Sequence, residues 1–217
     1  SSDYGDDSVR GRRKRQRCRR DSCHIDQRSS GGGRNSETFE SGTRSAACGG
    51  TTTIICFAAQ EKGELLTPVV EEYHEKAKRS CVDYSFHLII CDPNDQVMNA
   101  EVPKLIESGH RSLKLFMTYP RNRLNDAEIL KVLEVAKLNK ALVCVHAENH
   151  DAIMYMTEKL LAADKNSTKH HAWAKPPLVE REAVHRMIML SELLDVPIRI
   201  FHVSCEEAAE EIRRAQE

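Results

Sequence analysis

Short apolar runs alternate with amphipathic segments along most of this chain, and this alternation restricts the fold more than any other feature. Each run has the length of a buried strand, and each segment between runs has the apolar spacing of a helix. The expected strands cover residues 51–59, 84–91, 112–117, 141–147 and 197–204. The expected helices cover residues 66–79, 98–109, 126–139, 151–163, 178–194 and 205–216. This order predicts an α/β fold with about five parallel strands joined by helical crossovers.

The alternation leaves two architectures open. One is a doubly wound sheet, and the other is part of a (β/α)8 barrel of the TIM type. No Gly-x-Gly-x-x-Gly follows any expected strand, and the Gly49-Gly50 pair is not followed by a P-loop lysine. Nucleotide binding at a strand-to-helix turn therefore has little support.

Residues 1–36 differ in composition from the rest of the chain. They hold ten Arg or Lys, five Asp and almost no large apolar side chains. We expect residues 1–36 to be a disordered basic tail and residues 37–217 to form the folded domain. The basic run Arg10–Arg20 suggests a nucleic-acid partner, but no aromatic residue interleaves its arginines, so this partner is not favoured.

Composition indicates a globular protein that does not enter a membrane. The chain is 40% hydrophobic and 30% charged, and no apolar run approaches the roughly 18 residues of a membrane span. The eight cysteines show no paired short spacing. Cys48, Cys56, Cys91, Cys144 and Cys205 lie in or beside apolar runs, so we interpret them as reduced, buried thiols of a cytoplasmic protein.

Three polar residues interrupt the expected strands. Lys114 lies within residues 112–117, and burial of an ammonium group there needs compensation. A carbamate that bridges two metal ions, a Schiff-base lysine and a lysine that snorkels to the strand end all fit this position. His146 and His202 lie near the carboxyl ends of the next two strands, where parallel strands place their active sites. Two histidines beside a buried lysine predict a metal site.

Five ordered motifs carry a family resemblance. They are TFESGTRSAACGGTTTIICFA, SLKLFMTY, ALVCVHAEN, HAWAKPP and FHVSC, and they are collinear over about residues 36–217. Together they resemble the hydantoinase and dihydropyrimidinase branch of the cyclic amidohydrolases. The resemblance implies that residues 37–217 form a partial, metal-dependent (β/α)8 barrel. It also implies hydrolysis of the ring amide C–N bond of hydantoins or dihydropyrimidines, which are small-molecule cyclic amides.

The resemblance implies a role for each site residue. Carboxylated Lys114 would bridge two Zn²⁺ ions, and His146 and His202 would bind the second ion. Tyr119 would bind the substrate and stabilise the developing oxyanion. The family also implies a homo-oligomer, with a tendency towards tetramers, for the full-length protein.

Two departures from the family pattern stand out. The family's first strand ends in Asp-x-His-x-His. The corresponding segment here is DSCHIDQ, in which His24 matches the second histidine and the first histidine is missing. Asp21 matches the aspartate, but it lies one residue closer to His24 than the family pattern requires. The chain also stops before the strands that carry the family's catalytic aspartate. We therefore expect a fragment that is inactive alone, in which residues 1–20 are not native sequence.

A non-catalytic adaptor is the alternative function. The collapsin-response-mediator proteins share this barrel without metal ligands, and the missing histidine favours that reading. Retention of Lys114, His146 and His202 opposes it. Among other candidates, Glu148 and Asn149 are either partners of the metal ligands or plain loop residues, and His171 is expected at the pocket mouth.

Overall fold

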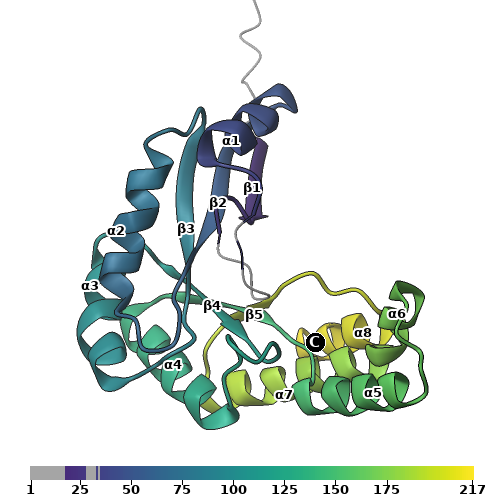
Figure 1. The fold of residues 1–217 in the computed structure, drawn as a ribbon. Coiled ribbons are helices and arrows are strands. Elements are labelled where there is room, and N and C mark those ends of the chain that lie inside the picture. The colour runs from purple at the N-terminus through teal and green to yellow at the C-terminus, as the bar shows by residue number, and fades with distance from the viewer. Residues whose placement is uncertain (1–17, 28–32, 34) are drawn as a thin grey trace, which may run out of the picture.

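The computed structural model describes residues 18–27, 33 and 35–217, and six parallel strands form its central sheet (Figure 1). Each strand pairs with the next strand in the sequence, in the order β1-β2-β3-β4-β5-β6. The strands are β1 (Cys18–Cys23), β2 (Thr51–Ala59), β3 (Asp83–Ile89), β4 (Ser112–Phe116), β5 (Leu142–His146) and β6 (Ile198–Ile200). A doubly wound sheet reverses its strand order at a switch point, whereas this sheet does not, so the order is that of part of a barrel.

Helices connect successive strands and cover one face of the sheet. They are α1 (Phe39–Cys48), α2 (Leu66–Ala77), α3 (Val102–Glu107), α4 (Asp126–Asn139), α5 (His150–Ala162), α6 (His171–Ala174), α7 (Pro177–Leu194) and α8 (Glu206–Ala215). The predicted start of α4 is confirmed. Asn125 accepts from the Glu128 backbone N–H at 2.9 Å, and the Glu128 carboxylate accepts from the Asn125 N–H at 2.8 Å.

The structure differs from the predicted elements at several places. Residues 18–23, which we expected within a disordered tail, form β1 and pair with β2. Helix α1 was not predicted, because its capping box uses Thr38 and Ser41 rather than a Glu or Gln. The predicted strand 197–204 is only Ile198–Ile200. The remainder of the predicted tail, residues 1–17, 28–32 and 34, lies outside the described residues.

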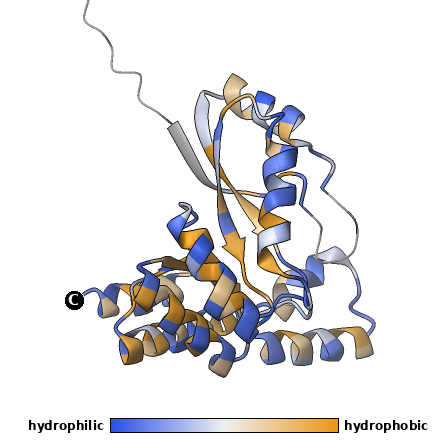
Figure 2. Cartoon of the chain, turned by 90° about the vertical axis from the view of Figure 1, so that its left-hand side faces the viewer, coloured by the Kyte–Doolittle hydropathy of each residue, from blue (hydrophilic) through white to orange (hydrophobic). Residues whose placement is uncertain are grey.

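The core has two parts, one on each face of the sheet. The larger part fills the space between the sheet and its helices, and Figure 2 shows mostly apolar strands next to helices that carry both polar and apolar residues. The smaller part lies on the inner face and consists of Phe57, Ile89, Phe116, Cys144 and Phe201. These inner side chains form an apolar floor beneath the carboxyl ends of the strands.

Seven cysteines, at positions 23, 48, 56, 81, 91, 144 and 205, are described as free thiols. Cys56, Cys91 and Cys144 are buried as expected, whereas Cys48 is exposed and Cys205 is half-buried. The expectation of burial is wrong for Cys48 because this residue ends helix α1 on the surface. Among the helices that the structure describes, none has the length and apolar character needed to cross a membrane.

A carboxylate from a later segment caps α2. Leu65, at the N-cap position of α2, provides no side-chain cap. The buried carboxylate of Glu101 accepts hydrogen bonds from the backbone N–H groups of Leu66 at 2.7 Å and Thr67 at 3.4 Å. Glu101 ends a π-helical turn, Val97–Glu101, that leads into α3. The negative charge thus satisfies the free N–H groups at the positive end of the α2 dipole.

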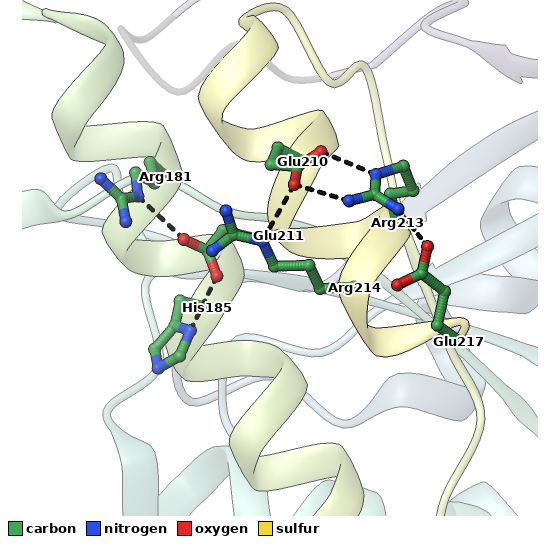
Figure 3. A network of polar contacts seen from close by, with 7 residues as sticks. All are labelled: Arg181, His185, Glu210, Glu211, Arg213, Arg214 and Glu217. Carbon is green, nitrogen blue, oxygen red and sulfur yellow. Dashed lines mark hydrogen bonds and ion pairs between the residues drawn. The ribbon is translucent and has the colours of Figure 1, made fainter.

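Ion pairs join α7 to α8 on the surface (Figure 3). Glu211 of α8 accepts from Arg181 at 2.8 Å and from His185 at 3.1 Å, both on α7. Within α8, Glu210 pairs with Arg213 and Arg214. Ion pairs with solvent-exposed cations contribute little energy individually, so we infer that their main effect is to orient α8.

Candidate metal and catalytic site

A cavity of about 960 Å³ lies at the carboxyl ends of the strands. The five residues to which the family resemblance gives a site role line it, namely His24, Lys114, Tyr119, His146 and His202. Lys114 lies in β4 and His146 ends β5, whereas His24, Tyr119 and His202 lie in the segments that follow β1, β4 and β6. The parallel order of the strands brings these distant residues together, because all strands end at the same edge.

Lys114 is buried in this cavity wall. Its side chain belongs to the inner face of β4 and the residue is 1% exposed. Its Nζ lies 4.3 Å from the ring centre of Phe201 and 4.8 Å from that of Phe116. Within the described residues, Nζ has no hydrogen-bond partner. Burial in these surroundings lowers the pKa of the amine from 10.5 to about 7, so a large share of it is neutral at physiological pH.

Two imidazole rings face each other at the cavity wall. Nδ1 of His146 lies 3.0 Å from Nε2 of His202. On its other side, Nε2 of His146 lies 2.6 Å from a carboxylate oxygen of Glu148. Burial lowers the pKa of His146, so the neutral ring donates its single N–H to Glu148. The Nδ1 lone pair then points towards His202, as a metal ligand requires.

His202 follows β6 in an unusual backbone conformation. Its φ of 38° lies in the left-handed region that side chains other than glycine rarely adopt. Its side chain is exposed to the cavity, and burial and the neighbouring His146 lower the pKa of the ring. A strained residue of this kind at a strand end indicates a functional constraint.

Glu148 is held by a second partner. Its carboxylate also accepts a hydrogen bond from Nζ of Lys175 at 2.9 Å. Burial alone would raise the pKa of Glu148, but the hydrogen bonds from His146 and Lys175 outweigh burial and lower that pKa to about 2. The carboxylate is therefore ionised and fixes the tautomer of His146.

Tyr119 lies beside this histidine. Its ring centre is 5.0 Å from that of His146 and 5.9 Å from that of Phe116. Lys175 approaches the same ring, with Nζ 5.3 Å from its centre. The backbone of Tyr119 has a φ of 71°, and its carbonyl accepts from Asn122 and Arg123, so a tight turn presents the phenol to the cavity.

His24 enters the cavity from the edge of the sheet that β1 forms. Its ring stacks on Phe57 with ring centres 4.5 Å apart, and its Nδ1 lies 2.6 Å from the side-chain oxygen of Gln27. Ser22, two residues earlier, lines the same cavity. Alternation along a strand places residues two apart on one face, so Ser22 occupies the position of the missing histidine.

The donor set fits a divalent metal ion, although it does not form a complete cage. Across residues 18–27, 33 and 35–217, no three His, Cys, Asp or Glu side chains are grouped closely enough to hold an ion. The fit rests on two facing imidazoles, His146 and His202, beside the buried amine of Lys114, which has no hydrogen-bond partner among the described residues. Imidazole nitrogen suits zinc, and a buried amine converted to an anionic carbamate would add the oxygen ligands.

Sequence reasoning identified the candidate ligands but missed part of their surroundings. Lys175 was not considered, since one lysine in the loop before α7 has no distinctive sequence signal. Glu148 contacts a candidate ligand, whereas Asn149 caps α5 by accepting from the Ala152 N–H at 3.0 Å. His171, expected at the pocket mouth, is not among the residues that line the cavity.

Comparisons with known proteins identify the family of this chain. The profile of the Amidohydrolase family matches residues 24–213. The D-hydantoinase of Ralstonia pickettii is 42% identical over 182 residues, which are 83% of this chain and 40% of that protein. The D-hydantoinase of Geobacillus stearothermophilus is 43% identical over 189 residues, 86% of this chain and 40% of that protein.

Solved structures show the same fold. A D-hydantoinase structure superimposes with a TM-score of 0.89 at 39% identity, covering 92% of this chain and 44% of that chain. The dihydropyrimidinase from Brevibacillus agri gives a TM-score of 0.88 at 38% identity, covering 92% and 43%. The prediction of a partial barrel is thereby confirmed. The chain spans about two fifths of the length of these relatives.

Proposed function

Because this chain belongs to the amidohydrolase family, we propose that it forms part of a metal-dependent hydrolase of cyclic amides. The bond broken would be the ring amide C–N bond of a hydantoin or dihydropyrimidine. The D-hydantoinases and the dihydropyrimidinase to which the chain is similar support this substrate class. We propose further that the longer protein is a cytoplasmic homo-oligomer.

One observation carries the proposal. The amine of Lys114 is buried without a hydrogen-bond partner in the described part of the chain, and its pKa is lowered to about 7. A neutral amine can attack carbon dioxide, forming an N–C bond and releasing one proton to solvent. The product is a carbamate anion on the lysine side chain. A lysine that only packed in the core would not be expected at this position. Its ammonium group would lose its hydration, because Lys114 is buried away from solvent.

Carboxylated Lys114, together with histidine ligands, would hold two Zn²⁺ ions. His146 and His202 would hold one ion, and His24 would contribute to the other. When bound, the ions would supply Lewis acidity and lower the pKa of a water molecule. The apolar floor formed by Phe57, Phe116 and Phe201 would strengthen these electrostatic effects by excluding bulk water.

Three further side chains would position the reaction. Tyr119 would donate its phenolic hydrogen bond to the oxygen that becomes negative as the ring carbonyl is attacked. Glu148 would keep His146 in the tautomer whose Nδ1 is unprotonated. Lys175 holds Glu148 ionised and lies against the Tyr119 ring, so it links the ligand to the substrate-binding tyrosine.

The carbamate can be tested directly on this chain. Incubation with ¹³C-bicarbonate and ZnCl2 is expected to give a carbamate carbon resonance in the ¹³C NMR spectrum. The Lys114→Met variant should lack the resonance, while Lys104→Met, which alters a surface lysine of α3, should retain it. A wild-type spectrum without the resonance, from a chain that is folded by circular dichroism, would refute the bridging role of Lys114.

A non-catalytic adaptor is not supported by the relatives reported above, which are hydantoinases and a dihydropyrimidinase. Metal analysis of a full-length homologue carrying this segment would separate the two functions. About two zinc ions per chain favour the hydrolase, and none favours the adaptor.

A further inference from the structure

A second pair of histidines meets at the opposite end of the sheet. His74 lies on α2 and His110 lies two residues before β4 begins. Tyr84, near the start of β3, completes the group. These positions are at the amino ends of the strands, and none of the three residues lines the cavity described above. In Figure 1, α2 runs along the outer side of β3.

The two rings face each other through equivalent atoms. Nε2 of His74 lies 3.3 Å from Nε2 of His110, with ring centres 5.2 Å apart and ring planes at 58°. Two nitrogens that bind one tetrahedral zinc ion at about 2.0–2.1 Å are separated by about 3.3–3.4 Å. The observed separation matches this value. It is longer than the roughly 2.9–3.0 Å that is most common when a protein N–H donates a hydrogen bond.

Neighbouring groups hold both rings in this arrangement. Nδ1 of His74 lies 3.4 Å from the hydroxyl of Tyr84, a contact to the outer nitrogen of the kind that orients metal-binding imidazoles. Phe86 packs against both rings, edge-on to His74 at 5.0 Å and nearly parallel to His110 at 6.1 Å. The position of each ring is therefore set before any ligand arrives.

His110 has one usable nitrogen. Its Nδ1 is buried and has no hydrogen-bond partner in the described part of the chain, so the ring can reach a partner only through Nε2. Burial, and then the neighbouring His74, lower the pKa of His110. The ring is consequently neutral near pH 7, which is the form that binds metal ions.

We propose that His74 and His110 form a second metal site, which takes a divalent transition-metal ion such as Zn²⁺. The two Nε2 atoms are its protein ligands, water completes the coordination, and Tyr84 orients His74. The ion links α2 to the segment that enters β4, two parts of the chain that are far apart in the sequence. This site is independent of the proposed hydrolase chemistry, because it lies at the other end of the strands.

Calorimetric titration of the metal-free full chain with ZnCl2 tests the site. In a His146→Gln/His202→Gln background, one binding event per chain is expected to remain. Adding His74→Gln or His110→Gln should abolish it or weaken it by at least about tenfold, since loss of an outer partner alone typically costs 10- to 100-fold. The matched control His185→Gln, on the exposed surface of α7, should leave it unchanged. Equal zinc stoichiometry with and without His74 and His110 would overturn the proposal.

A measurement on the unmodified chain covers the case in which a variant does not fold. Long-range ¹H–¹⁵N spectra resolve the ring nitrogens of each histidine during the same titration. Zinc should shift the Nε2 resonances of both His74 and His110. Shifts confined to the cavity histidines would rule the second site out.

Discussion

The Glu148 carboxylate lies 2.6 Å from Nε2 of His146, and His202 lies 3.0 Å from Nδ1 on the opposite side of the same ring. Each nitrogen of His146 thus has a distinct partner. The carboxylate selects the protonated nitrogen, and the other nitrogen is left to act as a ligand. Removal of the charge should therefore affect metal binding without direct loss of a ligand.

We expect Glu148→Gln to weaken zinc binding at the cavity by about 10- to 100-fold, as is typical for outer partners of metal ligands. The amide can still accept a hydrogen bond, so the fold should persist. Calorimetric titration with ZnCl2 in a His74→Gln/His110→Gln background measures the change. The control Glu192→Gln alters an exposed glutamate of α7 and should have no effect. Unchanged affinity in Glu148→Gln would show that the carboxylate does not fix the ring.

Lys114 should make the stability of the metal-free chain depend on pH. Its pKa is 10.5 when exposed in the unfolded chain and about 7 in the folded chain. Between these values the unfolded state binds more protons, so stability should rise as pH increases from about 7 towards 10.5. At about 1.36 kcal/mol per pKa unit, the full rise is roughly 5 kcal/mol.

Denaturant unfolding at pH 7 and pH 9.5, in buffer free of carbon dioxide and metal ions, measures this dependence. The Lys114→Met variant should lose most of the rise, because it keeps the side-chain volume and removes the amine. Lys140→Met, a surface control after α4, should keep the wild-type dependence. An equal rise in wild type and Lys114→Met would contradict the burial argument.

Ser22→His should improve metal binding near His24. Both residues line the cavity and lie two apart in the sequence, so the new imidazole would share a face with His24. Zinc content after dialysis is expected to increase by about one ion per chain, a rough estimate from one added ligand pair. Ser45→His places the same side chain on the exposed surface of α1 and should leave the content unchanged. No gain in Ser22→His would argue against His24 as a ligand.

Tyr119→Phe should reduce turnover in a full-length homologue that carries this segment. Loss of one oxyanion donor typically lowers kcat by about 10²–10³, with a smaller change in KM. The phenyl ring preserves the contacts with His146 and Phe116, so the melting temperature should barely move. Tyr155→Phe, on the exposed side of α5, is the control. A wild-type kcat in Tyr119→Phe would exclude the proposed role.

Much of the fold could be predicted from sequence periodicity. The strands around Lys114 and His146 are short, apolar and bounded by turns, and they lie where the pattern placed them. Strand β1 could not be found in this way. Its sequence, CRRDSC, has no apolar run, and it depends on pairing with β2 rather than on its own pattern.

The candidate site could be predicted only in part. Polar residues at strand ends have a clear signal, so Lys114, His146 and His202 were found. The pairing of His74 with His110 has no such signal, because the two residues are 36 positions apart and neither interrupts a strand. Lys175 was missed for the same reason. It contacts Glu148 in the folded structure, but nothing in the sequence spacing of the two residues indicates that contact.

The distant cap on α2 has a consequence for the order in which this protein forms. Glu101 lies 35 residues after Leu66, whose backbone N–H it binds. During synthesis, α2 therefore leaves the ribosome with its first turn unsupported and gains this anchor only after β3 and the following π-helical turn have emerged. One β–α unit of this barrel is therefore completed only when the next unit has been made. In a nascent chain arrested before residue 101, α2 should be less stable than in the finished protein.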